Sequence, residues 1–467
     1  MKIKEILNLI KGELLEGDYE GEINAIEQDT RLIQNGDTFI AFKGKIDGND
    51  FVNVAIEKGA STVIVNIQNI DTKGKKCNVI YVEDSLYALQ EIIRYKMNNI
   101  NTEVIGITGS VGKTSTREIV TEVLSTKYSV FKNEKNFNGL RGLPLTCSKI
   151  DNEDISVIEM GMDGLGQIDL LSNIIKPKIG VITNIGSSHI GILRSKENIL
   201  KAKTEILNGI RNNGFLILNI DDEYLNNYSL SYQKDERNIS LITFGINNEN
   251  AMFNATNIKE KAGKTYFNVN ITPEINLTFE INSLGTHNIY NSLTSIIIGK
   301  IFDLTHEEIQ KGLLNLKSTE RRLQKIELNN FILYDDSYNA SYESVKAAID
   351  FLSKEKSKGR YIYILGDVLE LGDFAEEYHR KIGDALTKNK IDVLITAGEN
   401  SIFINEQLNE NGIKIEQYHF NNVDDLIENL IQFKENDTVL VKASNGMKFN
   451  KLVSYLKENF SNFETIN

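Results

Sequence analysis

The chain has 467 residues, of which 41% are hydrophobic and 25% are charged, and its formal net charge is −13. Such a length predicts about two to four domains, and the composition is that of a globular protein. The acidic balance, without a strong block of Lys or Arg, argues against nucleic acid as the main partner but not against an anionic small substrate.

The N-terminus and the cysteines indicate a compartment. No apolar run reaches about 18 residues, so no membrane span is expected. Residues 1–17 (MKIKEILNLIKGELLEG) are charged and amphipathic, which is not typical of a secretion signal. Cys77 and Cys147 are the only cysteines, which favours a reducing environment, and we expect a cytoplasmic protein.

Short mixed elements occupy residues 1 to about 100, and 85–99 (SLYALQEIIRYKMNN) has a helical pattern. From Glu103 the pattern becomes strand, turn and helix. Near-continuous apolar runs between helical segments are typical of a parallel sheet covered on both faces. These runs lie at 103–108, 155–160, 178–185, 214–220 and 240–245.

The rest of the chain continues with two further patterns. Residues 264–281 alternate, which predicts antiparallel strands, and 287–302 is predicted to be a helix. After about Ser318 a second series of apolar runs follows, at 330–336, 360–367, 392–398 and 437–444. We therefore predict an α/β protein of three domains: a small N-terminal domain (1–100), a central domain with a mostly parallel sheet (101–317) and a C-terminal Rossmann-like domain (318–467).

The stretch VIGITGSVGKTSTREIV (104–120) joins an apolar strand to a helical segment through a glycine-rich turn. Glycines let the backbone turn tightly around an anion, and the helix offers its positive end. Lys113 is predicted to reach the terminal phosphates of ATP, and Thr114 to place its hydroxyl on Mg²⁺. The alternative is a plain strand–helix turn with an exposed lysine. The predicted P-loop residues are Gly109, Ser110, Val111, Gly112, Lys113, Thr114 and Ser115.

Two polar residues follow the neighbouring predicted strands. Glu159 ends one run, and His189 comes just after the next. Ligands of open parallel sheets bind at the carboxyl ends of the strands. Both side chains are therefore metal-ligand candidates beside the loop, and the alternatives are a solvated glutamate and a structural histidine.

The loop has Ile107 where the general P-loop motif has its first glycine, and this form resembles the Mur ligase family of ATP-dependent amide-bond ligases in peptidoglycan synthesis. The stretches EMGMDGLGQID (159–169) and ITNIGSSHIGILRSKENILKAKTEI (182–206) resemble motifs of its central domain, and NFNGLRGLPLT (136–146) resembles the segment between loop and metal site. The resemblance implies that Glu159 and His189 hold Mg²⁺, and that Lys203 matches the lysine that is carbamylated in the family.

The outer domains also resemble this family. DTRLIQNGDTFIAFKGKIDGNDF (29–51) is similar to its UDP-sugar-binding domain, with Asn49 where the family usually has His. ERRLQ (320–324), YDDSYNASYESVKAAIDFL (334–352) and LGDVLELGDFAEEYH (365–379) resemble the members that add a terminal dipeptide. The implied UDP-substrate residues are Thr30, Arg31, Asp47, Gly48 and Asn49, and the implied further ATP residues are His287, Asn288, Arg322, Asp336 and Asn339.

The resemblance implies a monomeric ligase that uses ATP and Mg²⁺ to join D-alanyl-D-alanine to UDP-N-acetylmuramoyl-tripeptide through an acyl phosphate. Its catalytic residues would include Lys113, His189 and Lys203. Two alternatives remain: a Mur-type ligase that adds a single amino acid, and a P-loop nucleotide-binding regulator or motor without ligase activity. The sequence leaves open whether the third peptide residue is diaminopimelate or lysine.

Overall fold

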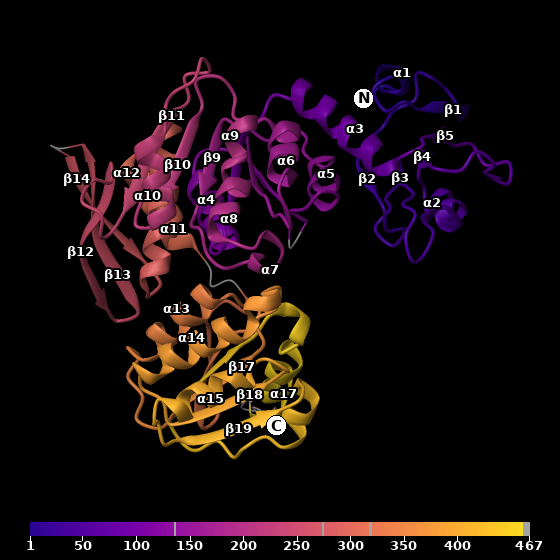
Figure 1. Ribbon diagram of the computed structural model, residues 1–467. Coiled ribbons are helices and arrows are strands. Elements are labelled where there is room, and N and C mark those ends of the chain that lie inside the picture. The colour runs from indigo at the N-terminus through magenta and orange to yellow at the C-terminus, as the bar shows by residue number, and fades with distance from the viewer. Residues whose placement is uncertain (135–136, 273–274, 317–319, 461–467) are drawn as a thin grey trace, which may run out of the picture.

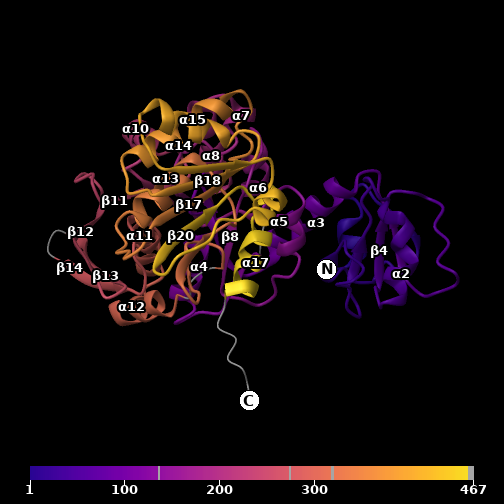
Figure 2. The same ribbon diagram turned by 90° about the horizontal axis from the view of Figure 1, so that it is seen from below.

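The computed structural model describes residues 1–134, 137–272, 275–316 and 320–460, and it contains three sheets in succession along the chain. The C-terminal sheet lies against one edge of the central part, and the N-terminal sheet projects to one side (Figure 1). Seen from below, the N-terminal part stands apart from the other two (Figure 2). The α/β class with three sheet-containing parts is confirmed. The predicted domain boundaries stay predictions, and the one between 317 and 318 lies outside the described residues.

The N-terminal part has a sheet of order β1-β5-β4-β3-β2, parallel except for β1. The predicted helix at 85–99 is α3 (Ser85–Asn99), which Asp84 caps through its side chain. One face of α3 packs on α5 and α6 and so joins this part to the central sheet. The other elements are α1 (Ile3–Ile6), β1 (Glu13–Glu16), β2 (Ile26–Glu27), β3 (Thr38–Ile40), η1 (Gly48–Phe51), α2 (Val52–Glu57), β4 (Thr62–Val65) and β5 (Asn78–Tyr81).

The central sheet has the order β14-β13-β12-β11-β10-β9-β6-β8-β7, parallel from β7 to β12 and antiparallel from β12 to β14. The five apolar runs are five of its strands, as predicted. The strands are β6 (Glu103–Thr108), β7 (Val130–Lys132), β8 (Ile155–Glu159), β9 (Ile179–Ile182), β10 (Phe215–Asn219), β11 (Ser240–Gly245), β12 (Phe253–Lys261), β13 (Lys264–Thr272) and β14 (Ile275–Ile281).

Helices cover both faces of this sheet, which is why its central strands are apolar throughout. One core joins Ile105 and Val157 to α4 and α11, and the other joins Val104 and Ile158 to α6 and α9. The helices are α4 (Lys113–Leu124), α5 (Gly142–Cys147), α6 (Gln167–Ile175), α7 (Ile190–Leu193), α8 (Lys196–Thr204), α9 (Ile206–Gly209), α10 (Glu223–Ser231), α11 (Thr286–Ile301) and α12 (His306–Asn315).

The C-terminal sheet has the order β15-β16-β20-β17-β18-β19, in which only β15 is antiparallel to its neighbour. Its strands are β15 (Gln324–Glu327), β16 (Phe331–Asp336), β17 (Tyr361–Gly366), β18 (Val393–Ala397), β19 (Glu416–Phe420) and β20 (Asp437–Lys442). Its helices are α13 (Tyr342–Leu352), η2 (Gly372–Phe374), α14 (Ala375–Thr387), α15 (Ile402–Glu410), α16 (Val423–Glu428), η3 (Asn445–Met447) and α17 (Asn450–Phe460).

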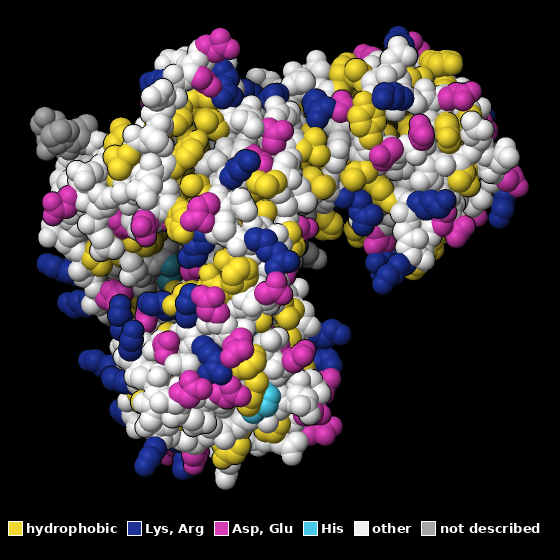
Figure 3. Space-filling model, viewed as in Figure 1, with side chains coloured by type: hydrophobic (Ala, Val, Ile, Leu, Met, Phe, Trp, Pro, Cys, Tyr) yellow, Lys and Arg dark blue, Asp and Glu magenta, His cyan; other side chains and the backbone are white. Residues whose placement is uncertain are grey.

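The surface agrees with the charge pattern of the sequence. On the face drawn in Figure 3, acidic and basic side chains are interspersed rather than gathered by sign. In the part of the chain that the structure describes, every helix is too short or too polar to cross a bilayer.

Candidate active site

The glycine-rich turn links β6 to α4 and is held by residues that follow β9. Gly109 has φ +149°, and a Cβ there would lie 1.8 Å from Thr183 Oγ1, so no larger residue fits. Thr183 Oγ1 donates to the Val111 carbonyl over 2.6 Å. Asn184 accepts from the Val111 N–H over 2.9 Å and donates back to its carbonyl over 2.9 Å. The loop is therefore a rigid cradle, as a phosphate-binding turn requires.

Lys113 begins α4 and curls back over this cradle. Its Nζ donates to the carbonyls of Gly109 over 2.7 Å and Ser110 over 3.2 Å. Burial lowers the pKa of the Lys113 ammonium, and the nearby Glu159 carboxylate acts in the opposite direction. A phosphate in the cradle would give this ammonium a stronger, charged acceptor than the two carbonyls.

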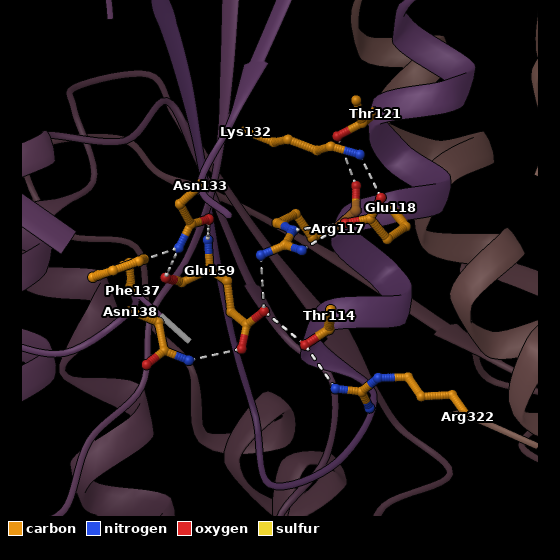
Figure 4. Close-up of polar contacts among 10 residues, drawn as sticks. All are labelled: Thr114, Arg117, Glu118, Thr121, Lys132, Asn133, Phe137, Asn138, Glu159 and Arg322. Atoms are coloured by element: carbon orange, nitrogen blue, oxygen red, sulfur yellow. Dashed lines mark hydrogen bonds and ion pairs between the residues drawn. The ribbon is translucent and has the colours of Figure 1, made fainter. Parts of the chain in front are cut away.

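Glu159, at the end of β8, lies beside the loop as predicted and is 3% exposed. Its Oε2 accepts from Thr114 Oγ1 over 2.8 Å, and its Oε1 accepts from Asn138 Nδ2 over 2.8 Å (Figure 4). Arg322 of the C-terminal part donates to Thr114 Oγ1 over 3.0 Å. A buried carboxylate, the P-loop hydroxyl and an arginine from another part of the chain thus meet at one point.

Arg117 is a member of this cluster that the sequence did not single out. Its Nη1 lies 3.4 Å from Glu159 Oε2, and its Nε donates to Glu118 Oε1 over 3.1 Å. Lys132 in turn contacts the other oxygen of Glu118 (Figure 4). Its position in the sequence could have identified it, because Arg117 follows Lys113 by four residues and so lies on the same face of α4.

His189 precedes the short helix α7 and has a left-handed backbone, φ +64°, but its side chain makes no capping hydrogen bond. Its Nδ1 lies 2.7 Å from Glu370 Oε2 and 3.9 Å from Asp163 Oδ1. The imidazole lowers the pKa of the Glu370 carboxyl, against the opposing effect of desolvation. Glu370 lies in the C-terminal segment LGDVLELGD, where no local pattern distinguishes it from its acidic neighbours.

Lys203 lies on α8 and is 2% exposed, so it is a buried lysine and not a surface one. Burial first, and then the positive charge of Lys113, lowers the pKa of its amine well below the ordinary lysine value. A lowered pKa favours the neutral amine, which is the form that adds to CO₂.

The residues predicted to bind ATP, with the exception of Gly109, line one cavity of about 840 Å³ between the central and C-terminal parts. Within it Asp336 and Lys442 form an ion pair of 2.7 Å, and Arg322 lies 4.3 Å from the Tyr338 ring centre. Burial lowers the pKa of the His287 imidazole. The predicted residues that line the cavity are Ser110, Val111, Gly112, Lys113, Thr114, Ser115, Glu159, His189, His287, Asn288, Arg322, Asp336 and Asn339.

The five residues predicted for the UDP-substrate are not part of this cavity. Arg31 is largely exposed and pairs with Asp29 over 2.6 Å, which lowers the pKa of that carboxyl to about 2. Asp47 accepts from the Asn49 N–H over 2.9 Å and caps η1. Their predicted contacts with a nucleotide sugar stay predictions.

The donor set next to the loop fits Mg²⁺. The described residues contain no group of three or more His, Cys, Asp or Glu side chains that would form a metal cage. Mg²⁺ seldom uses such a cage, because it is usually held by one or two carboxylates together with phosphate oxygens and waters. Glu159, joined to the Thr114 hydroxyl at the mouth of the cradle, meets that requirement.

The three-part fold and the cavity between two α/β parts define an ATP-dependent enzyme of the P-loop type. Comparison with known proteins is more specific. The Mur ligase middle domain matches residues 107–299, and the Mur ligase, glutamate ligase domain, matches 321–445. The chain belongs to the Mur ligase family and is therefore an ATP-dependent ligase, which confirms the resemblance.

Individual relatives match along the whole chain. The UDP-N-acetylmuramoyl-tripeptide–D-alanyl-D-alanine ligase of Bacillus subtilis is 37% identical over 464 residues, 98% of each chain. The crystal structure of MurF from Acinetobacter baumannii has a TM-score of 0.85 at 25% identity, covering 98% of this chain and 99% of that one. MurF from Thermotoga maritima in complex with ADP has a TM-score of 0.79 at 26% identity, covering 93% and 97%.

Proposed function

We propose that this chain joins D-alanyl-D-alanine to UDP-N-acetylmuramoyl-tripeptide in the synthesis of peptidoglycan precursors, driven by ATP. The relatives that match along the full chain are named for this activity, which supports the two substrates. The observation that carries the proposal is the meeting of Thr114, Glu159 and Arg322, which brings the phosphate loop, a metal-type carboxylate and the C-terminal domain to one point.

The chemistry explains the need for ATP. A carboxylate does not react with an amine at neutral pH, because oxide is not a leaving group. Attack of the tripeptide's terminal carboxylate on the γ-phosphorus forms an acyl phosphate and releases ADP. The amine of the dipeptide then attacks the acyl carbon, and phosphate leaves from the tetrahedral intermediate with the proton balance completed by loss of an amine proton.

The residues of this chain act in the first step by placement and charge. Lys113 and Arg322 would meet the negative charge that collects on the transferring phosphoryl group. Thr114, Glu159 and His189 would hold Mg²⁺, which supplies further positive charge to the phosphates when it is bound. Arg322 reaches Thr114 only from the docked C-terminal domain, so docking completes the site and limits access of water to the acyl phosphate.

Lys203 has the environment of a lysine that reacts with CO₂. Its amine is buried, its pKa is low, and Lys113 supplies a positive charge that a carbamate would neutralise. The carbamate converts an ammonium into a carboxylate-like group, which would help to orient Mg²⁺.

In this proposal the two outer domains bind the substrates. The N-terminal domain binds the UDP group through Thr30, Arg31 and the turn at 47–49, and the C-terminal domain closes over ATP and binds the incoming dipeptide. All partners are small molecules, and the enzyme acts as a cytoplasmic monomer. The domains are those proposed from the sequence, at 1–100, 101–317 and 318–467.

The test is ADP release by the purified enzyme with UDP-linked tripeptide, with and without an acceptor. The expected result is turnover that requires both the tripeptide and D-alanyl-D-alanine. Turnover of the UDP-linked dipeptide with a single amino acid would instead identify a Mur-type ligase that adds one residue. Nucleotide hydrolysis independent of any UDP-sugar would refute the ligase assignment in favour of a nucleotide-binding regulator.

A further inference from the structure

Two residues with left-handed backbones face each other across the boundary between the central and C-terminal domains. His189 and Glu370 both have φ +64°, a region that residues other than glycine seldom adopt. Their side chains approach to 2.7 Å between Nδ1 and Oε2, which is an ion-pair distance, but the ring does not aim its Nδ1–H at that oxygen and Nδ1 forms no hydrogen bond with any residue that the structure describes. Strained backbone on both sides of one contact persists only where the surrounding structure enforces it, and such strain clusters at functional sites.

Backbone packing fixes Glu370 relative to His189. Figure 1 shows α7 at the edge of the central part that faces the C-terminal part. The Gly191 N–H donates to the Glu370 carbonyl over 3.1 Å. A Cβ on Gly191 would lie 2.6 Å from the Gly372 nitrogen, so the two chains touch with no room for a side chain. The contact is therefore set by the docking of two backbones.

A carboxylate at this nitrogen has a specific chemical consequence. A histidine that binds a metal ion usually gives its other ring N–H to a carboxylate or a carbonyl, which fixes the tautomer and the orientation of the ring. A neutral imidazole carries its proton on one nitrogen and a lone pair on the other. A carboxylate 2.7 Å from Nδ1 favours the tautomer with its proton on Nδ1 and its lone pair on Nε2, and a turn of the ring would complete that hydrogen bond.

We propose that Glu370 is a positioning residue, which holds the Nδ1 proton of His189 so that Nε2 is presented to the Mg²⁺ of the bound nucleotide. This inference rests on the metal role given to His189 in the proposed function. Because Glu370 belongs to the C-terminal domain, the metal site is complete only when that domain is docked. Metal affinity and docking are then linked, and each strengthens the other.

The same interface offers a matched control. Arg194 and Asp373 form an ion pair of 2.6 Å on its outer side, and both side chains are mostly exposed. Asp373→Asn removes an ion pair between the same two domains, three residues from Glu370, without touching His189. If Glu370 served only to clamp the domains, the two substitutions would have similar effects.

The first measurement is binding of Mn²⁺ to the enzyme–ADP complex, followed by electron paramagnetic resonance. Glu370→Ala is expected to weaken Mn²⁺ binding by about 10–100-fold, the usual effect of losing such a partner. Glu370→Gln keeps an oxygen that accepts the Nδ1 proton, so its binding should stay closer to wild type. Asp373→Asn should bind Mn²⁺ as wild type does, and thermal melting checks that each variant is folded.

The second measurement reads the tautomer itself in the metal-free enzyme. The chain has five histidines, so ¹⁵N-histidine labelling gives few ring signals, and His189→Gln assigns the one of interest. Wild type and Glu370→Gln are expected to show the Nδ1–H form, and Glu370→Ala a shift toward Nε2–H. An unchanged tautomer and unchanged Mn²⁺ affinity in Glu370→Ala would overturn the inference, as would an equal loss of affinity in Asp373→Asn.

Neither measurement uses the UDP-peptide or the dipeptide, so the two proposals can fail separately. Loss of Mn²⁺ affinity in Glu370→Ala without any ligation by wild type would refute the proposed substrates and leave the role of Glu370 standing. Normal ligation by wild type with no response of Mn²⁺ or tautomer to Glu370→Ala would refute only the role of Glu370.

Discussion

A chain of ion pairs runs behind the phosphate loop, from Lys132 through Glu118 and Arg117 to Glu159. We expect the buried pair at one end to contribute more to stability than the exposed pair at the other. At the inner end the side chains of Arg117 and Glu159 are 5% and 4% exposed, whereas at the outer end Glu118 is 20% and Lys132 35% exposed. Arg117→Met removes the cation that lies between two carboxylates, and breaking a buried pair in this way costs about 3–5 kcal/mol. Lys132→Met removes a partly exposed partner and should cost at most about 1 kcal/mol.

The assay must report on the central domain alone, because a chain of several domains does not unfold in a single step. Hydrogen exchange measured by mass spectrometry gives the free energy of opening for amides of α4 and β8. Arg117→Met should lower this free energy by the larger amount. Adding Glu159→Gln to Arg117→Met should recover part of the loss, because it removes the buried carboxylate that is left without its cation.

Two results would refute this reasoning. Equal losses in Arg117→Met and Lys132→Met would mean that burial does not set the strength of these pairs. A loss below about 1 kcal/mol in Arg117→Met would mean that Glu159 does not depend on the guanidinium.

Three further outcomes follow from the same structure. Lys113→Ala should keep the circular dichroism spectrum but lower ligation by at least two to three orders of magnitude, roughly 3–4 kcal/mol, and near-normal ADP release would contradict the loop assignment. Gly191→Ala places a Cβ 2.6 Å from the Gly372 nitrogen, so scattering of the ADP complex should show a larger radius of gyration than wild type, and an unchanged radius would count against docking at α7. Enzyme equilibrated with ¹³CO₂ should show a carbamate carbon signal that Lys203→Ala lacks, and a signal in neither would exclude the modification.

Much of the fold follows from the chain because apolar runs and local patterns determine it. The buried strands of the central sheet and the helix at 85–99 were predicted, since a parallel sheet covered on both faces needs continuous apolar strands. The strands missed in the central and C-terminal parts are β7, β12, β15 and β19. β7 is only three residues long, β12 is mostly exposed, and β15 and β19 are edge strands with partly exposed side chains.

The candidate site was predictable where a local motif carries it and not where distant segments meet. The P-loop residues form one motif, and Glu159 and His189 follow from the ends of β8 and β9, the strands on either side of β6. The contact from Arg322 to Thr114 joins residues 208 positions apart, and no local pattern encodes such a meeting. Buried charged residues are equally hard to predict from the sequence. Arg117 and Lys203 resemble surface residues of polar helices until the packing around them is known.

The most direct test of the proposed reaction traces one oxygen atom from the peptide carboxylate to the released phosphate. UDP-linked tripeptide is prepared with ¹⁸O in its terminal carboxylate and turned over with ATP and D-alanyl-D-alanine, and the released phosphate is analysed by mass spectrometry. If the cradle activates that carboxylate, each phosphate carries one ¹⁸O atom from the peptide. Phosphate without ¹⁸O would mean that water, and not the peptide, attacks ATP, and the account would be wrong.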